Sequence, residues 1–145
     1  MMNLKSYLEL KVDDQEYLSA FTITGSNIQF SGTIYIHEDS RSLADFANSL
    51  IDFPKYEKKL FFEMGHKDSR FSYFSISLYP TQSLSHIGVQ ITMVTDAHFR
   101  DEDQCKIQFE IIVEPSAIDE FRKALSRISH KGSGNAILYG KDNRI

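Results

Sequence analysis

The chain has 145 residues, a size typical of one domain, and its 41% hydrophobic content is sufficient for a core. A single cysteine excludes an internal disulfide, and a net charge of −4 argues against a nucleic-acid partner. No stretch approaches the roughly 20 apolar residues of a membrane span, which argues against a membrane partner. The N-terminus MMNLKSYLEL lacks a signal-peptide pattern, so we expect a cytoplasmic protein.

The first third of the chain alternates apolar and polar side chains, a period of two that predicts half-buried strands. Three segments share this pattern: residues 4–12, 17–24 and 28–36. Asp13-Asp14 and Gly25-Ser26-Asn27 form turns readily, so we expect an antiparallel meander. Gly32 falls on the inward face, where it indicates either a bulge or a close approach by a helix.

The period then changes to that of a helix. Its apolar stripe consists of Leu43, Phe46, Ala47, Leu50 and Ile51. Glu38 and Asp39 precede this helix, where acidic side chains are favoured by the helix dipole.

The second half repeats the scheme with more strands. We predict strands at residues 60–64, 71–79, 87–93 and 104–114 and a helix entered through Ser116 that continues to Ile128. The strand from Gln104 to Glu114 has the clearest alternation, and it places Cys105 inward, as a small buried hydrophobe.

The order of these elements is βββαββββα, and short links between strands favour hairpins over parallel crossovers. We therefore expect an α+β protein with one antiparallel sheet of about seven strands and both helices on one face. Residues 1–130 would form a single domain. Residues 131–145 would form a flexible tail, although the apolar run 136–139 leaves open an added edge strand, on this chain or on a neighbour.

No catalytic or nucleotide-binding motif occurs in the chain, so we predict a non-enzyme without cofactors or metals. The loop before the clearest strand is acidic; its ionisable residues are Asp96, His98, Asp101, Glu102 and Asp103. Their spacing fits no calcium loop, and a charged hairpin loop explains them.

The outward side of residues 71–79 combines large rings with small hydroxyl groups, a composition suited to contact surfaces. It presents Phe71, Tyr73, Ser75, Ser77 and Tyr79, and we call this surface the aromatic-serine face. The neighbouring strand would add His86, Gln90 and Thr92. The face is either open or covered by a helix.

One family shows a similar pattern. The segment FSGTIYIHEDSRSLADFANSLIDFP (residues 30–54), the strands that follow it and the helix EPSAIDEFRKAL (114–125) resemble the WapI-like small bacterial immunity proteins of polymorphic toxin systems. The resemblance covers roughly residues 4–130. It implies a cytoplasmic protein that neutralises a toxin by binding it, and an acidic chain would suit a basic toxin domain.

The first hypothesis is therefore a non-enzymatic protein-binding module. Its candidate contact residues are Glu38, Asp39, Tyr73, Tyr79, Asp101, Glu102 and Asp103. A second is a small-ligand-binding protein or enzyme with a cleft between sheet and helices, near His37, His66 or His86. A third is a structural homo-oligomer, with a homodimer as its simplest form.

Overall fold

The computed structural model describes residues 5–14, 18–55, 58–82 and 85–143. Within these residues the chain forms eight strands and two α-helices, which confirms the α+β class. One sheet has the order β3-β2-β1-β8, with β1 (Ser6–Asp13), β2 (Ser19–Asn27), β3 (Ser31–Glu38) and β8 (Gly134–Tyr139). The other has the order β4-β5-β6-β7, with β4 (Leu60–Gly65), β5 (Tyr73–Pro80), β6 (Ile87–Val94) and β7 (Lys106–Val113). The helices are α1 (Arg41–Ser49) and α2 (Pro115–Lys131).

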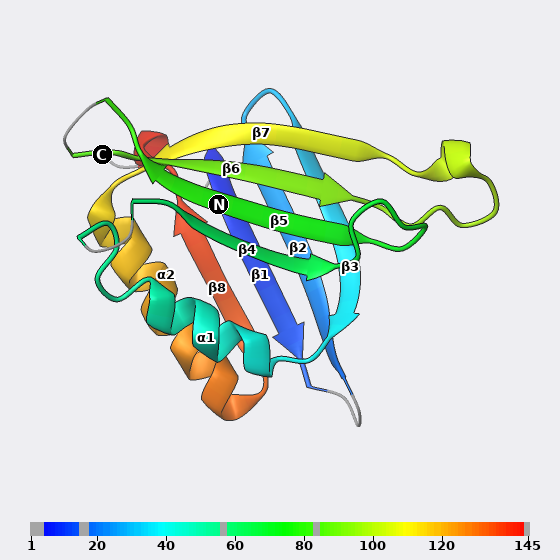
Figure 1. Cartoon of the computed structure of the whole chain (residues 1–145), viewed down its shortest axis with the longest axis horizontal. Helices are drawn as coiled ribbons and strands as arrows, with labels where there is room; N and C mark the ends of the chain where they lie inside the picture. The colour runs from blue at the N-terminus through cyan, green and yellow to red at the C-terminus, as the bar shows by residue number, and fades with distance from the viewer. Residues whose placement is uncertain (1–4, 15–17, 56–57, 83–84, 144–145) are drawn as a thin grey trace.

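The expectation of one sheet with about seven strands was wrong. Two antiparallel sheets of four strands cross at a steep angle, as Figure 1 shows. Among the described residues β3 and β4 do not pair, because α1 and the connector after it carry the chain from one sheet to the other. Each sheet has one apolar face, and stacking the two apolar faces removes both from water.

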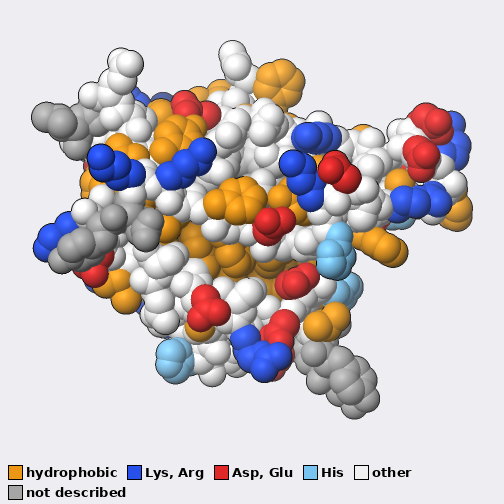
Figure 2. Space-filling view, in the orientation of Figure 1, with side chains coloured by type: hydrophobic (Ala, Val, Ile, Leu, Met, Phe, Trp, Pro, Cys, Tyr) orange, Lys and Arg blue, Asp and Glu red, His pale blue; other side chains and the backbone are white. Residues whose placement is uncertain are grey.

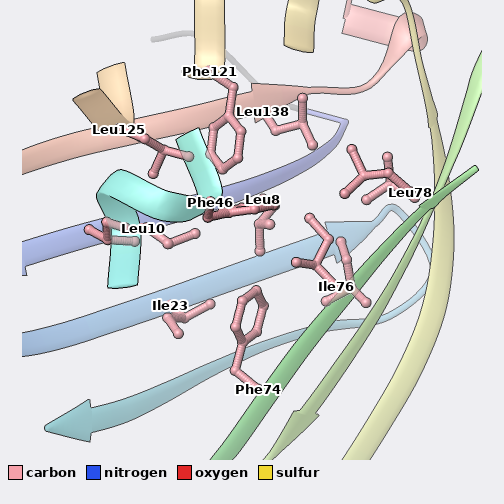
Figure 3. Packing of buried hydrophobic residues seen from close by; sticks show 14 of the residues in the cluster. Leu8, Leu10, Ile23, Phe46, Phe74, Ile76, Leu78, Phe121, Leu125 and Leu138 are labelled. Carbon is pink, nitrogen blue, oxygen red and sulfur yellow. The ribbon is translucent and has the colours of Figure 1, made fainter. Parts of the chain in front are cut away.

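We had expected both helices to cover one face of a single sheet. Instead they fill the opening at one side of the two sheets (Figure 1). Phe46 of α1 joins the parts: its ring stacks on Phe62 of β4 at 4.4 Å and meets Phe121 of α2 edge-on at 6.5 Å. Figure 3 shows the same residue pointing toward Leu8 of β1. One cluster of buried side chains therefore draws on both sheets and both helices. No helix in the described part of the chain is long and apolar enough to cross a membrane.

The two sheets approach most closely where β2 and β3 carry glycine. A Cβ on Gly25 would lie 3.0 Å from the Phe109 ring and 3.3 Å from the Met93 sulfur, and one on Gly32 would lie 3.6 Å from Ile107. The register between β2 and β3 is unbroken at Gly32, so there is no bulge there. The close neighbour that Gly32 indicated is a strand of the opposite sheet, not a helix.

Regular structure continues from α2 through residue 143, so the expectation of a flexible tail from residue 131 was wrong for this segment. Gly132 ends α2 with a φ of 84° and donates to the carbonyl oxygen of Ile128 at 2.7 Å. The chain then returns as β8, antiparallel to β1, and buries Ala136 and Leu138 in the core. The alternative that we left open, an edge strand on this chain, is confirmed.

Cys105 is exposed, so its expected burial was also wrong. It has the same parity as Ile107 and Phe109, as the alternation indicated, but it precedes β7 in the part of the hairpin that extends past the first sheet (Figure 1). Periodicity predicts which way a side chain points, and it does not predict whether a second sheet reaches that far.

Candidate functional site

The outer face of the β4–β7 sheet is covered by neither helix and is hollowed into a groove of about 470 Å³. Figure 2 looks onto this face, where apolar side chains lie along the middle with charges of both signs around them. The groove is lined by Phe61, Glu63, His66, Lys67, Asp68, Ser69, Phe71, Tyr73, Ser75, Ser77, Gln90, Thr92, Val94, Gln104, Lys106 and Gln108. The aromatic-serine face is therefore open, and much of it lies in this groove.

Small polar side chains form the floor of the groove. Ser75 and Ser77 come from the middle of β5, and Thr92 lies beside Ser75 on β6. The amide of Gln108 on β7 donates to the Thr92 hydroxyl at 3.2 Å, which fixes the floor across two strands. The hollow arises because the central positions carry short side chains while longer ones stand around them.

Two loops close one end of the groove by binding to each other. One joins β4 to β5, and the other is the segment 95–105 between β6 and β7, which we call the arm. The Ala97 amide donates to the Arg70 carbonyl at 2.8 Å, and the Arg70 guanidinium donates back to the Ala97 carbonyl at 3.3 Å. The backbone amide of Ser72 donates to the Asp96 carboxylate at 2.6 Å, and the side-chain amide of Gln104 donates to the Ser69 carbonyl oxygen at 2.9 Å. These bonds attach both ends of the arm to the β4–β5 loop.

Exposed aromatic rings line the groove and also occur on the arm. Phe61 on β4 is 56% exposed, Phe71 in the β4–β5 loop is 70% exposed, and Phe99 on the arm is 90% exposed. Scattered single hydrophobic residues are ordinary on a protein surface, but Phe61 and Phe71 line one hollow together, which makes a patch of the kind found at interfaces.

The acidic residues of the arm have two different roles. Asp103 accepts hydrogen bonds from the amides of Phe99 and Arg100 and from the Arg100 guanidinium, and the guanidinium holds the pKa of its carboxyl below the ordinary value. It thereby shapes the short 3₁₀ turn Asp101–Asp103 (η1). Asp101 and Glu102 instead keep most of their side chains in solvent, 88% and 74% exposed. Among the described residues no three His, Cys, Asp or Glu side chains come together to hold a metal ion.

Glu38 and Asp39 lie away from the groove, where β3 leads into α1. Asp39 accepts hydrogen bonds from the Arg41 amide at 2.9 Å and the Arg41 Nε at 2.7 Å, and the guanidinium lowers the pKa of its carboxyl. The local contact explains Asp39 as part of the entry to the helix. The fold does not bring these two residues together with the other five candidates.

Tyr73 and Tyr79 are parts of the face itself. Tyr73 is only 6% exposed in the floor, and its hydroxyl donates to Glu63 at 3.2 Å; burial raises its pKa. Tyr79 lies outside the groove lining. Its ring covers Gly88 on the neighbouring strand, where any Cβ would collide with it, and its hydroxyl donates to Glu110 on β7. The pKa of Tyr79 is strongly raised, mainly by burial and in addition by the hydrogen bond to Glu110.

Sequence reasoning missed the outermost contributors, Phe99 and the β7 side chains Lys106 and Gln108. The signal for Phe99 was a lone aromatic residue in an otherwise polar loop. Of the histidines singled out, only His66 lines the groove. The neighbouring Ser69 hydroxyl donates to the carbonyl oxygen of His66 at 2.7 Å, which is a loop contact and not a pairing with the imidazole ring.

No protein-family model matches the chain, and no curated protein matches it. A functional assignment therefore depends on the chemistry of the groove and the arm. Their hydroxyl, amide and charged groups can make many hydrogen bonds, and the rings can bury apolar surface against another molecule.

Proposed function

We propose that this chain is a non-enzymatic protein-binding module, and that the groove and the arm together form its contact surface. The partner proposed is a basic protein domain, as expected for an immunity protein that neutralises a bacterial toxin. The observation that supports this most strongly is Phe99, a ring 90% exposed on an arm whose ends are bonded to the loop that lines the groove.

Burying the exposed aromatic rings against a protein partner would be more favourable in free energy than leaving them in water. Burying one aromatic ring contributes about 1.5–3 kcal/mol, and interface energy concentrates in a few such residues. Phe71 lines the groove, and Phe99 lies on the arm, whose two ends are bonded to the loop that carries Phe71. The loops are therefore partly ordered before a partner binds, which lowers the cost of burying the rings.

Charge favours a basic partner. Asp101 and Glu102 are the most exposed acidic groups of the arm, and the whole chain carries a net charge of −4. Exposed charges of one sign accelerate association with the opposite sign and are screened by salt. We therefore expect the association rate to fall as ionic strength rises, and to fall in the same way when Asp101 and Glu102 are both replaced by Lys.

The proposal predicts that a gene beside the one for this chain encodes a secreted toxin, and the test uses the C-terminal domain of that protein as its probe. Binding is measured by calorimetry for the wild type and for Phe99→Ala. We expect at least about a tenfold loss of affinity, because truncating one buried ring removes about 1.4 kcal/mol or more. The matched control is Tyr35→Ala, since Tyr35 is 66% exposed on the outer face of the other sheet.

Three outcomes would contradict the proposal: no adjacent gene for such a secreted protein, no binding to its C-terminal domain, or equal losses in the Phe99 and Tyr35 variants. The volume of the groove also suits a small polar ligand. That alternative predicts binding that Phe71→Ala weakens and Phe99→Ala leaves unchanged, because Phe99 does not line the groove.

A further inference from the structure

The second feature that the fold leaves exposed is the free edge of β7. Among the described residues β7 pairs only with β6, and Figure 1 shows it along the border of the molecule. Its eight residues contain no bulge or proline, so the edge is of the kind that can bind another strand.

The ladder determines which backbone groups face outward. The Thr95 amide donates to the Cys105 carbonyl at 2.9 Å, just before the first paired residues Val94 and Lys106. Antiparallel ladders alternate, so the odd-numbered residues of β7 bond to β6. Lys106, Gln108 and Glu110 therefore direct their N–H and C=O groups away from the sheet.

The β2–β3 hairpin lies behind this edge. Gly25 lies against Phe109, and Gly32 lies against Ile107, so the hairpin crosses beneath β7 and its tip emerges on the far side (Figure 1). The tip exposes two large apolar side chains, Ile28 and Phe30, each 62% accessible. The tip therefore lies beside the place that a strand added to β7 would occupy.

We propose that the occupant of this edge is a second copy of the chain, with the two β7 strands antiparallel and the two-fold axis at Gln108. In this register Lys106 of each copy lies opposite Glu110 of the other, which gives two pairs of opposite charge on one face. Lys106 makes no ion pair with any described residue of its own chain.

The neighbouring registers are less favourable. An axis at Phe109 places Lys106 opposite Ile112, and an axis at Glu110 places the two Glu110 carboxylates against each other. The strand is thus self-complementary in one register. The dimer would form one continuous sheet of eight strands, and the two grooves would lie on the same face because Lys106 and Gln108 line each of them.

The test measures the oligomeric state of the purified chain alone by sedimentation velocity over a series of concentrations, so it does not depend on the proposed toxin partner. The wild type should form dimers. Lys106→Glu and Glu110→Lys should each weaken dimerisation by at least about tenfold, because each places like charges opposite one another. The double variant Lys106→Glu/Glu110→Lys should restore the wild-type dimer.

Two control variants distinguish the loss of strand pairing from a general effect of changed charge or of a lost hydrogen bond. Lys11→Glu makes the same charge change at an exposed position of β1 and should leave the dimer intact. Tyr79→Phe removes the hydroxyl that bonds Glu110 without changing charge and should also leave it intact.

Gln108→Pro tests the backbone directly, since it removes an outward N–H and leaves the ladder to β6 whole. We expect a folded monomer, with the fold checked by near-ultraviolet circular dichroism. If Gln108→Pro unfolds the chain, the charge-swap series decides alone. A wild type that stays monomeric at every concentration, or a double variant that fails to recover the dimer, would overturn the proposal.

Discussion

The two faces of β5 show what the fold requires and what it leaves free. On the inner face Phe74, Ile76 and Leu78 are at most 1% exposed and belong to the core cluster that also includes side chains of the opposite sheet and the helices (Figure 3). On the outer face Ser75 and Ser77 fill the same strand with short polar side chains and leave a hollow. Packing dictates the first set, whereas nothing in the fold demands a hollow floored by serine. The difference indicates that the outer face is available for binding.

The largest expected effect comes from placing a charged residue on the inner face of β5, compared with the same change on its outer face. Leu78→Asp should lower the free energy of unfolding by about 4 kcal/mol or more, because it leaves a cavity and buries an unpaired charge. Ser77→Asp, one residue away on the outer face, should change it by about 1 kcal/mol or less. Urea unfolding measures both, and equal losses would mean that the outer face is also structural.

The same contrast holds on β8, the edge strand that the sequence suggested only as an alternative. Leu138 is fully buried, and Ile137 beside it is only partly buried. Leu138→Ala should cost about 2–5 kcal/mol of stability, and Ile137→Ala clearly less. If Leu138→Ala were as mild as Ile137→Ala, the C-terminal segment would not be part of the core.

The tyrosines of the outer face give an intermediate effect that depends on pH. Burial raises the pKa of both Tyr73 and Tyr79 above the ordinary value of 10.0. The folded state therefore retains these protons where the unfolded state has begun to lose them, and stability is full below about pH 10 and falls as pH rises further. Tyr79→Phe should reduce this fall, measured by urea unfolding at about pH 9 and about pH 11. An identical fall in the variant would contradict the strong shift at Tyr79.

The smallest effect is expected at Cys105, which lies outside both packed faces. Cys105→Ser should change the free energy of unfolding by no more than about 0.5 kcal/mol. In the native protein the thiol should react with a thiol reagent nearly as fast as in urea, since it is exposed. Strong protection of the native thiol would show that the hairpin folds back over it.

Local patterns predicted much of this fold. Alternation located the strands and most of their inward residues, and the stripes from Leu43 to Leu50 and from Ile118 to Ile128 located both helices. The turn expected at residues 25–27 was wrong, because these residues belong to β2 and the tip instead carries Ile28 and Phe30, which are exposed. Such patterns report the environment of a residue relative to its own element. They carry no information on whether β3 pairs with β4, which depends on contacts between elements far apart in the chain.

The same limit applies to the site. The open aromatic-serine face was among the alternatives that the alternation of residues 71–79 allowed. The closed end of the groove was not predictable, because it depends on the bonds of Arg70 and Ser72 to the arm. Asp39 and Asp103 looked alike in sequence, as two acidic candidates for one contact surface. In the structure Asp39 binds Arg41 and Asp103 binds Arg100, and the two pairs lie in different parts of the molecule.

The most direct test of the proposed binding face is amide hydrogen exchange of the chain with and without the C-terminal domain of the adjacent secreted protein. We predict slower exchange in the arm and in the loop between β4 and β5, with β1, β2 and the two helices unchanged. Protection confined to the helices or to the outer face of the β3-β2-β1-β8 sheet would contradict the assignment of the groove and the arm as the contact surface.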